Sequence, residues 1–479
     1  MGVQKYIFLQ FVPTFLCINS LSPENQCVRT NQKQFWMIER GGKSTTFLVI
    51  NDGLIEFFAL SMGLGDGSLH FLSYLILLDK KKHLSLQIEN RIYKMQKLIK
   101  RASQDIVNQY LEIFPAVVIL GSRQCGKSTL IKMMADQLGN FLYLDLQNRD
   151  DWVKLEEPTL LFQNNQDRII CLDEIQLRPE LFSVLRSEID RDRRPGRFIL
   201  LGSASQSLVK NSSETLAGRI GIIDLTPFLI KEVEALDDFD LKHYWWRGGY
   251  PDSYNAASDE SSRLWRENFI RTYVERDIPQ LGYQITSMQM LRLMTMLAHS
   301  QGQLLNASKL GESLGITHPT IRRHIDILEQ TYLVRTLQPY FANTKKRLVK
   351  SPKVYLRDSG LLHQLLSIRN FNELLGQPVF GASWEGLVVE NVCASIRNAT
   401  FSFYRTATGN EIDLIVEKAY KTIAIECKTS TAPQLTEGFW KSLDDIQPDE
   451  AYVVALVASS YEIKNGVKVC NLVDLLHLV

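Results

Sequence analysis

The sequence lacks an excess of charge of either sign, and it lacks any cysteine pattern that could hold a disulfide framework or a zinc ion. Lysine and arginine number 54 and aspartate and glutamate 53, so the net charge is +1 and any basic surface must be local. The seven cysteines are scattered, odd in number and without zinc-ligand spacing, and the eight histidines form no HExxH pattern. We therefore expect a reduced intracellular protein, located in the cytoplasm.

A membrane-spanning pattern is also lacking. From Leu54 to Leu78 the chain is largely apolar, but two acidic residues and a histidine interrupt the run, whereas a transmembrane helix needs roughly 20 predominantly apolar residues. We expect no membrane partner. Hydrophobic residues make up 45% and charged residues 22%, as in globular proteins. Because 479 residues exceed the roughly 100–200 of one domain, we expect several domains.

The first 94 residues differ in character from the rest. Regular, well-patterned sequence begins near Met95, where a helical stretch leads into the first convincing strand. The segment Gly41–Thr45 has the ending of a phosphate loop, but Met37 stands where the first glycine should be and no suitable strand precedes it. Our hypothesis is that Met95 is the functional start and that residues 1–94 are an extension or an over-called reading frame.

A phosphate-binding loop follows the first convincing strand. The apolar, β-branched run from Ala116 to Leu120 predicts a strand buried on both faces. It leads into the pattern G-x-x-x-x-G-K-[ST], which helix-forming residues follow. The nine residues of this motif are Gly121, Ser122, Arg123, Gln124, Cys125, Gly126, Lys127, Ser128 and Thr129. The strand–loop–helix context predicts a nucleotide-binding site.

The residue types of this loop suit ATP and Mg²⁺. Gly121 and Gly126 allow the backbone to turn its N–H groups toward phosphate oxygens, and the following helix adds the positive end of its dipole. Lys127 would reach the β- and γ-phosphates, and the hydroxyl of Ser128 would ligate Mg²⁺. We expect ATP and Mg²⁺ as cofactors.

A second buried strand ends in acidic residues. Four apolar residues, from Ile169 to Leu172, precede Asp173 and Glu174. Asp173 would hold the Mg²⁺ shell through water or through Ser128, and Glu174 would polarise the attacking water. The alternative is that Asp173 caps the next helix.

The strands alternate with helical segments, which predicts an α/β fold with five mostly parallel strands. The remaining strands are expected at residues 141–146, 198–201 and 220–225. Ligands of such sheets bind at the carboxyl ends of the strands. Ser203 follows the fourth strand, where its hydroxyl could touch the γ-phosphate or the attacking water, or could simply belong to a turn.

Several of these motifs together resemble one known family. The phosphate loop, the pair Asp173-Glu174, and the segments Leu200–Ser203 and Leu216–Arg219 are similar to those of prokaryotic AAA-type P-loop ATPases. The C-terminal half of that family is classed as domain of unknown function 4143. The resemblance extends roughly from Met95 to the C-terminus.

The resemblance implies further roles. Ser203 takes the sensor position, and Arg219 is the candidate arginine finger or nucleotide-sensing arginine, with a surface ion pair as the alternative. Arg247, in the segment Trp246–Pro251, also matches a family motif. Rings are common among AAA-type proteins, so a homo-oligomer is a candidate partner.

A helix–turn–helix pattern follows a helical connector. Apolar residues at helical spacing predict a helical lid over residues 232–300, and the chain then forms two short helices with Thr317 as cap of the second. We expect this second helix to carry Arg322, Arg323 and His324 outward. A β-wing should follow, with Lys345-Lys346-Arg347 at its tip. Such a winged helix indicates binding of double-stranded DNA, with docking of a protein as the alternative.

The last part of the chain carries a second set of chemical groups. Asp413 lies on one predicted strand and Glu426 and Lys428 on the next. Asp413 and Glu426 would bind a divalent metal ion and Lys428 would orient or deprotonate water. This pattern resembles the restriction-endonuclease-like fold, which implies Glu385 as an additional metal ligand. Ion pairing of Lys428 with either acid is the alternative.

Together these patterns predict an α/β protein with a P-loop NTPase parallel sheet, a helical lid, a winged helix and a C-terminal restriction-endonuclease-like domain. The expected segments are 1–94, 95–231, 232–300, 301–357 and 358–479. We expect an ATPase coupled to DNA recognition, with DNA cleavage left open. The alternative is a nucleotide-gated regulator or adapter whose nuclease-like domain is inactive. A small-molecule kinase is disfavoured, because no acceptor-pocket motif accompanies the phosphate loop.

Overall fold

The computed structural model separates the chain into two compact units, Met1–Met95 and Gln96–Val479. It describes residues 98–203, 215–280, 283, 285–341 and 347–479, together with the backbone of the strands between residues 5 and 60.

The first unit contains antiparallel strands. Five of them form a sheet in the order β4-β5-β6-β7-β8, in which β1 also pairs with β6, and β2 pairs with β3. The strands are β1 (Lys5–Leu9), β2 (Phe11–Val12), β3 (Phe15–Leu16), β4 (Asn19–Ser22), β5 (Asn25–Thr30), β6 (Lys33–Arg40), β7 (Ser44–Asn51) and β8 (Leu54–Leu60). Gly41–Lys43 lie outside the described residues, but the strands on either side of them pair antiparallel. The strand–loop–helix context of a phosphate loop is therefore missing here.

A five-stranded parallel sheet begins the second unit, in the order β10-β11-β12-β9-β13. Its strands are β9 (Ala116–Gly121), β10 (Phe141–Asp145), β11 (Ile169–Asp173), β12 (Phe198–Ser203) and β13 (Ile220–Leu225). Every residue of β9 is buried, because β9 lies between two strands and helices cover both faces. The prediction of five parallel strands is confirmed. The helices here are α2 (Ser103–Ile113), α3 (Lys127–Leu138), α4 (Arg149–Lys154), α5 (Pro158–Asn164) and α6 (Leu181–Arg191).

A helical segment follows the sheet. It comprises α8 (Ile230–Val233), α9 (Leu241–Arg247), α10 (Pro251–Tyr254), α11 (Asp259–Thr272), the π-helix η2 (Tyr273–Asp277), α12 (Ile278–Gln280) and α13 (Ser287–His299). Trp265, Phe269 and Tyr273 stack in succession, with ring centroids 5.1 and 6.2 Å apart. This aromatic stripe belongs to the core that α13 and the next two helices share.

The helix–turn–helix consists of α14 (Ala307–Leu314) and α15 (His318–Gln330), and the strands β14 (Val334–Pro339) and β15 (Lys353–Leu356) form an antiparallel pair after it. Thr317 caps α15 by accepting a hydrogen bond from the N–H of Thr320 (3.4 Å), as predicted. The prediction for His324 was wrong: it is 7% exposed. His324 follows Ile321 by three residues and precedes Leu328 by four, so it lies on the apolar face of the helix.

The C-terminal part is built on a mixed eight-stranded sheet, in the order β15-β14-β16-β17-β18-β19-β21-β20. Because β14 pairs with β15 on one side and with β16 on the other, this sheet continues across the expected boundary at residues 357 and 358. Its further strands are β16 (Ala399–Arg405), β17 (Glu411–Lys418), β18 (Lys421–Cys427), β19 (Glu450–Val454), β20 (Tyr461–Glu462) and β21 (Lys468–Cys470). The helices are α16 (Ser359–Leu365), α17 (Phe371–Leu375), α18 (Phe380–Ser395), α19 (Glu437–Ile446) and α20 (Leu472–Leu478).

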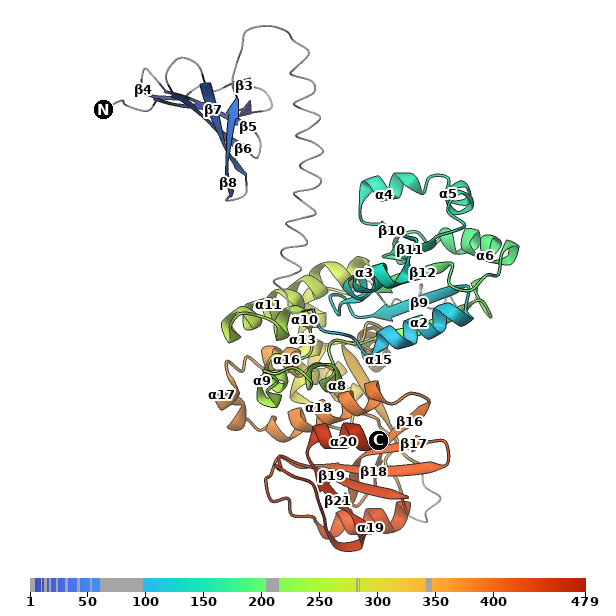
Figure 1. The fold of residues 1–479 in the computed structure, drawn as a ribbon. Coiled ribbons are helices and arrows are strands. Elements are labelled where there is room, and N and C mark those ends of the chain that lie inside the picture. Colours follow the sequence, from blue (N-terminus) through green and yellow to red (C-terminus); the bar gives the residue numbers. More distant parts are fainter. Residues whose placement is uncertain are drawn as a thin grey trace. The chain divides into compact units, whose positions relative to one another are not determined.

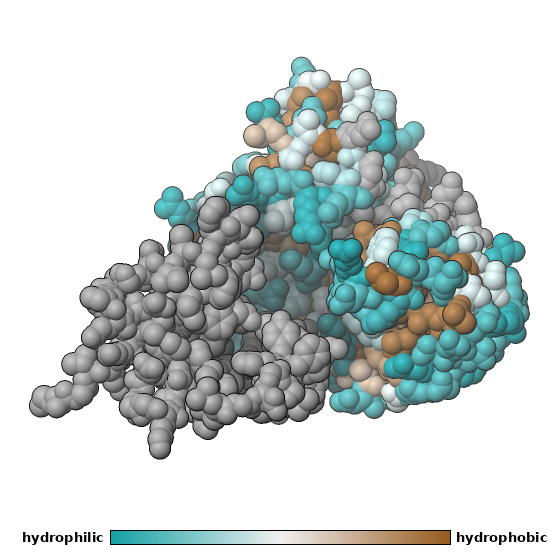
Figure 2. Space-filling model, turned by 90° about the horizontal axis from the view of Figure 1, so that it is seen from above, coloured by the Kyte–Doolittle hydropathy of each residue, from teal (hydrophilic) through white to brown (hydrophobic). Residues whose placement is uncertain are grey.

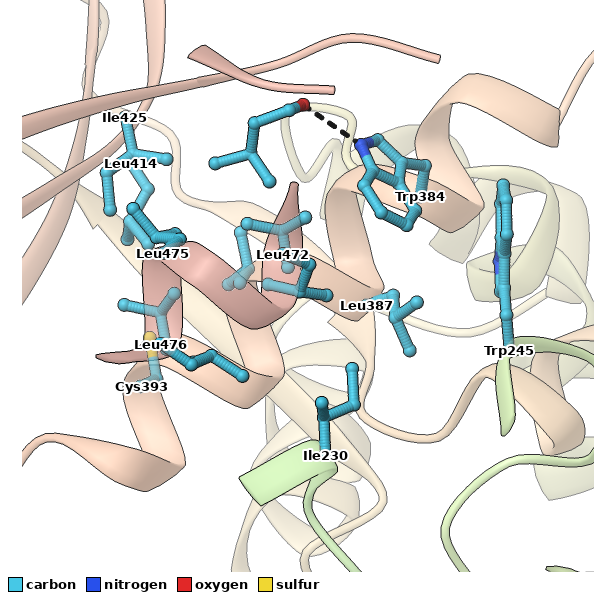
Figure 3. Close-up of a cluster of buried hydrophobic side chains, with 14 of the residues drawn as sticks. Ile230, Trp245, Trp384, Leu387, Cys393, Leu414, Ile425, Leu472, Leu475 and Leu476 are labelled. Carbon is cyan, nitrogen blue, oxygen red and sulfur yellow. Dashed lines mark hydrogen bonds between the residues drawn. The ribbon is translucent and has the colours of Figure 1, made fainter. Parts of the chain in front are cut away.

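One apolar core joins the helical segment to this sheet. Figure 3 shows Ile230 of α8 and Trp245 of α9 near side chains of α18, and Leu475 of α20 beside Leu414 of β17. Trp384 also donates a hydrogen bond from Nε1 to the carbonyl oxygen of Val454 (3.2 Å). Burying one such large apolar side chain contributes about 1.5–3 kcal/mol.

The helices of residues 230–330 lie between the parallel and the mixed sheet of the second unit (Figure 1). On the face shown in Figure 2, hydrophilic residues cover most of the described surface and hydrophobic residues form patches among them. Within the described residues, no helix is both long and apolar enough to cross a bilayer.

Candidate functional site

The phosphate loop leaves the carboxyl end of β9 and ends at the start of α3. A Cβ atom on Gly121 would lie 2.2 Å from the carbonyl oxygen of Leu225, so only glycine fits there. Gly126, the residue before α3, has a φ of 101°, which glycine adopts without strain. Both glycines are therefore required by the backbone path of the loop.

Lys127 lies inside this loop. Its Nζ donates hydrogen bonds to the carbonyl oxygens of Gly121 (3.1 Å) and Ser122 (2.8 Å), and the residue is 6% exposed. The ammonium group is thus held where the loop surrounds it, beside the N-terminus of α3.

Ser128 and Asp173 are brought together as predicted. The hydroxyl of Ser128 donates to Oδ2 of Asp173 (2.5 Å), Tyr143 donates to the same oxygen, and the N–H of Glu174 donates to Oδ1 (2.9 Å). Burial first, and the Asp173 charge second, raise the pKa of Tyr143, so this phenol stays protonated as a donor. The short helical turn after β11 has no side-chain cap, so the alternative role of Asp173 as a helix cap finds no support.

Glu174 and Ser203 line the same pocket beside the phosphate loop. Glu174 has a positive φ of 57° and accepts a hydrogen bond from Gln176, so its carboxylate is held in one place. The residues around the pocket come from three parts of the chain: Gly121, Ser122, Arg123, Gln147, Glu174, Gln176, Leu177, Ser203, Tyr273, Asp277, Gln280 and Thr331.

The wall of this pocket opposite the sheet comes from the helical segment and from the end of the helix–turn–helix. Arg123 of the loop forms an ion pair with Asp277 of η2. Burial raises the pKa of Asp277, and the nearby Arg123 opposes that shift. Tyr273 and Thr331 share a hydrogen bond between their hydroxyl groups. The residue after Thr331, Tyr332, donates to Asp224 of β13.

Arg219 lies away from the pocket residues and forms two hydrogen bonds with Asp190 of α6, at 2.8 and 2.9 Å. This arrangement is the surface ion pair that we considered as the alternative. Arg247 is buried at the end of α9, where it bonds to Asp259 (2.8 Å) and to the carbonyl oxygen of Tyr254 (3.4 Å). Its partners are therefore structural ones.

Sequence reasoning missed Arg101, which supports the phosphate loop from behind. It is 3% exposed and donates to the carbonyl oxygens of Cys125 (3.0 Å) and Thr226 (2.6 Å) and to Glu232 (3.0 Å). It precedes the loop by twenty residues in a segment without a motif, so no sequence signal identified it.

Arg322 and Arg323 are exposed on α15, and neither has an ion-pair partner among the described residues. Lys345 and Lys346 lie outside the described residues. The carbonyl oxygen of Arg347 accepts a hydrogen bond from the N–H of Ala407 (2.8 Å), beside the end of β16.

The acidic residues of the C-terminal part converge as predicted. Glu385 comes from α18, Asp413 from β17 and Glu426 from β18. Burial first, and the Asp413 charge second, raise the pKa of Glu385 to about 7 and that of Glu426 to about 8. Lys428 donates to Oε1 of Glu426 (2.6 Å), which is the ion pair considered as its alternative role.

A lysine that sequence reasoning missed lies among these acids. Nζ of Lys353 is 2.7 Å from Glu385, 2.5 Å from Glu411 and 3.2 Å from Asp413, and the residue is 1% exposed. In the described part of the chain, no three histidine, cysteine, aspartate or glutamate side chains are arranged to hold a metal ion. Two of the predicted ligands, Glu385 and Asp413, thus contact Lys353, and the third, Glu426, pairs with Lys428.

Comparisons with known proteins cover most of the second unit. Residues 114–234 match a family described as an AAA domain, residues 238–372 a domain of unknown function (DUF8612), and residues 380–475 a domain of unknown function (DUF4143).

Two relatives are uncharacterized proteins. One from Mycobacterium tuberculosis is 39% identical over 333 residues, which are 70% of this chain and 74% of that protein. One from Haemophilus influenzae is 25% identical over 286 residues, 53% of this chain and 70% of that protein. Among solved structures, a Walker-type ATPase of Pyrococcus abyssi is 15% identical, with a TM-score of 0.40, over 56% of this chain and 96% of that one.

Proposed function

Because this chain belongs to the family of P-loop ATPases that join an AAA domain to a C-terminal domain of unknown function 4143, we propose that it is a Mg²⁺-dependent ATPase coupled to binding of double-stranded DNA. The observation that carries the coupling is the composition of the nucleotide pocket. Its wall includes Thr331, at the end of the second helix of the helix–turn–helix. We propose the cytoplasm as its location.

The loop residues fit a nucleotide with Mg²⁺. The close approach at Gly121 leaves space only for backbone, Lys127 supplies a buried positive charge, and Ser128 and Asp173 provide two adjacent oxygen ligands. Mg²⁺, when bound, would neutralise negative charge on the phosphates. Ser128 and Asp173 would hold it, and Lys127 would turn from its loop carbonyls toward the phosphates.

Glu174 and Ser203 are the proposed hydrolytic groups. The carboxylate of Glu174, oriented by Gln176, would accept a proton from the attacking water. Ser203, at the carboxyl end of β12, would contact the γ-phosphate or that water. Arg219 does not line the pocket of its own chain, so a role as arginine finger requires a neighbouring copy in a homo-oligomer.

Competition for Arg123 supports the coupling. A phosphate group in the pocket would attract the guanidinium that Asp277 now pairs with. A shift of Asp277 would move η2, and the bond between Tyr273 and Thr331 would pass this movement to the end of α15. Arg322 and Arg323 lie on that same helix, free to contact DNA phosphates or base edges.

The test is ATP turnover measured with and without double-stranded DNA. We expect DNA to raise turnover several-fold, and Lys127→Ala to lose ATP binding and turnover. Lys441→Ala, an exposed lysine of α19 that pairs with Glu437, is the control and should leave ATP affinity unchanged. Unchanged nucleotide affinity in Lys127→Ala would contradict the assigned pocket, and equal turnover with and without DNA would contradict the coupling.

A second candidate is a nucleotide-gated adapter whose C-terminal domain binds without cleaving. The position of Lys353 among the predicted metal ligands favours it. A Mg²⁺-dependent cleavage assay on varied DNA, run beside Asp413→Ala, separates the two candidates. Cleavage by the unaltered protein alone supports a nuclease, whereas no cleavage by either protein favours the adapter.

A further inference from the structure

The C-terminal acid cluster is already supplied with a cation. An ammonium group carries three N–H donors, and Nζ of Lys353 has three carboxylate oxygens around it, those of Glu385, Glu411 and Asp413. Each donor therefore has an acceptor. The lysine comes from β15, whereas the acids come from α18 and β17, so the cluster fastens three elements together.

The second oxygens of Asp413 and Glu411 also have partners in the protein, whereas Oε2 of the neighbouring Glu426 is buried without one. Oδ2 of Asp413 accepts from the N–H of Cys427 (2.9 Å), and Oε2 of Glu411 pairs with Arg405 (3.0 Å). Oε1 of Glu385 accepts from the hydroxyl of Tyr355 (2.6 Å) as well as from Lys353. A divalent ion would have to displace these donors.

Charge counting points the same way. Lys353, Arg405 and Lys428 face the four carboxylates of Glu385, Glu411, Asp413 and Glu426. Three positive charges therefore already oppose at most four negative ones. A buried charge persists only when it is paired, and Lys353, at 1% exposed, has these carboxylates as its partners in place of water.

We infer that Lys353 is the resident cation of this cluster, and that its ammonium group occupies the position a divalent metal ion would take between Glu385 and Asp413. The site therefore holds β15 against α18 and β17 as a permanent ionic joint. The residues as arranged do not fit a metal ion, and the C-terminal domain would contact its partner without metal-dependent cleavage.

The test uses Mn²⁺ alone, without nucleotide, and counts bound ions per full-length chain by electron paramagnetic resonance. We expect the unaltered protein and Asp413→Asn to bind the same number of ions. Lys353→Met should bind one more, and the double variant Lys353→Met/Asp413→Asn should lose it again. Lys421→Met is the matched control, because it removes a lysine paired to Glu450 on the same sheet, outside the cluster.

Two results would overturn this assignment. The first is an ion bound by the unaltered protein and missing from Asp413→Asn. The second is a folded Lys353→Met that binds no extra ion. If circular dichroism finds Lys353→Met unfolded, the comparison of the unaltered protein with Asp413→Asn decides alone. The count does not depend on ATP turnover, so it stands apart from the test of the ATPase.

Discussion

At the scale of single residues, burial fixes the protonation state of several polar groups. His363 is fully buried between Trp246 and Ser383. Nδ1 of His363 faces the carbonyl oxygen of Trp246 (3.3 Å), which can only accept, so Nδ1 carries a proton. A neutral imidazole then accepts at Nε2 from the hydroxyl of Ser383 (2.8 Å). Burial, as the main cause, lowers the pKa of His363 to about 3.

This burial predicts a pH-dependent stability. The unfolded chain takes up the proton of His363 near pH 6.5, whereas the folded chain does so only near pH 3. The contribution of neutral His363 to the free energy of unfolding is thus fully present above about pH 6.5. It is lost as the pH falls, by about 2–3 kcal/mol at pH 4.5. In urea unfolding at pH 7 and pH 4.5, His363→Gln should reduce the difference between the two pH values by that amount.

The control is His318→Gln, which changes an exposed histidine at the start of α15. The difference in its free energy of unfolding between pH 7 and pH 4.5 should equal that of the unaltered protein. If His363→Gln retains the full difference in the free energy of unfolding between pH 7 and pH 4.5, the assignment of a neutral imidazole to His363 is wrong.

At the scale of elements, α15 is fixed to the ATPase sheet at its C-terminal end and exposes its arginines nearer its N-terminal end. Tyr332, just after this helix, donates a hydrogen bond to Asp224 on β13, and Arg357 lies 5.1 Å from the centre of its ring. β13 also supplies the carbonyl oxygen that contacts Gly121 of the phosphate loop. The end of α15 is therefore connected to the loop through one strand.

Removing this connection should weaken coupling. We expect Tyr332→Phe to keep its ATP turnover without DNA, since the residue does not line the pocket, but to lose at least half of the stimulation by DNA. The melting temperature should fall slightly, because one hydrogen bond contributes about 0.5–1.5 kcal/mol. Tyr420→Phe, at a fully exposed turn, is the control. If DNA stimulates the ATP turnover of Tyr332→Phe as strongly as that of the unaltered protein, coupling through Tyr332 and Asp224 is excluded.

Local patterns were enough to predict the elements of the ATPase part. Apolar runs that alternate with helical segments predicted the five parallel strands. The glycine-rich motif after one run and the two acids after another predicted the approach of Ser128 to Asp173. Contacts between residues far apart in the sequence were not predictable. Asp277 meets a loop residue 154 positions earlier, and Lys353 meets Asp413 across 60 positions. The orientation of His324 could have been predicted, because its spacing from Ile321 and Leu328 places it on the apolar face.

At the scale of the whole molecule, the chain divides at Met95 into two compact units. We propose that the second unit folds and works by itself, because the five apolar cores of its described residues and both of its sheets are built from residues after that point. A protein spanning Met95–Val479 should melt at the temperature of the corresponding transition in the full chain and keep its ATP turnover. Light scattering with ATP would give its assembly state.

A truncated protein that loses turnover while remaining folded would show that residues 1–94 contribute to activity. Peptides from residues 1–94, recovered by mass spectrometry of the native protein, would refute the hypothesis that translation starts at Met95.

The sheet that runs unbroken from β15 to β20 limits how the second unit can respond to ATP. The strand β14 pairs both with β15 and with β16. The helix–turn–helix and the C-terminal domain therefore cannot separate without breaking hydrogen bonds between these strands. We therefore expect the helix–turn–helix and the C-terminal domain to move as one rigid body, with any hinge between this body and the nucleotide-binding core. If α15 binds a DNA duplex as proposed, that duplex would stay at the same distance from the C-terminal domain throughout the ATP cycle.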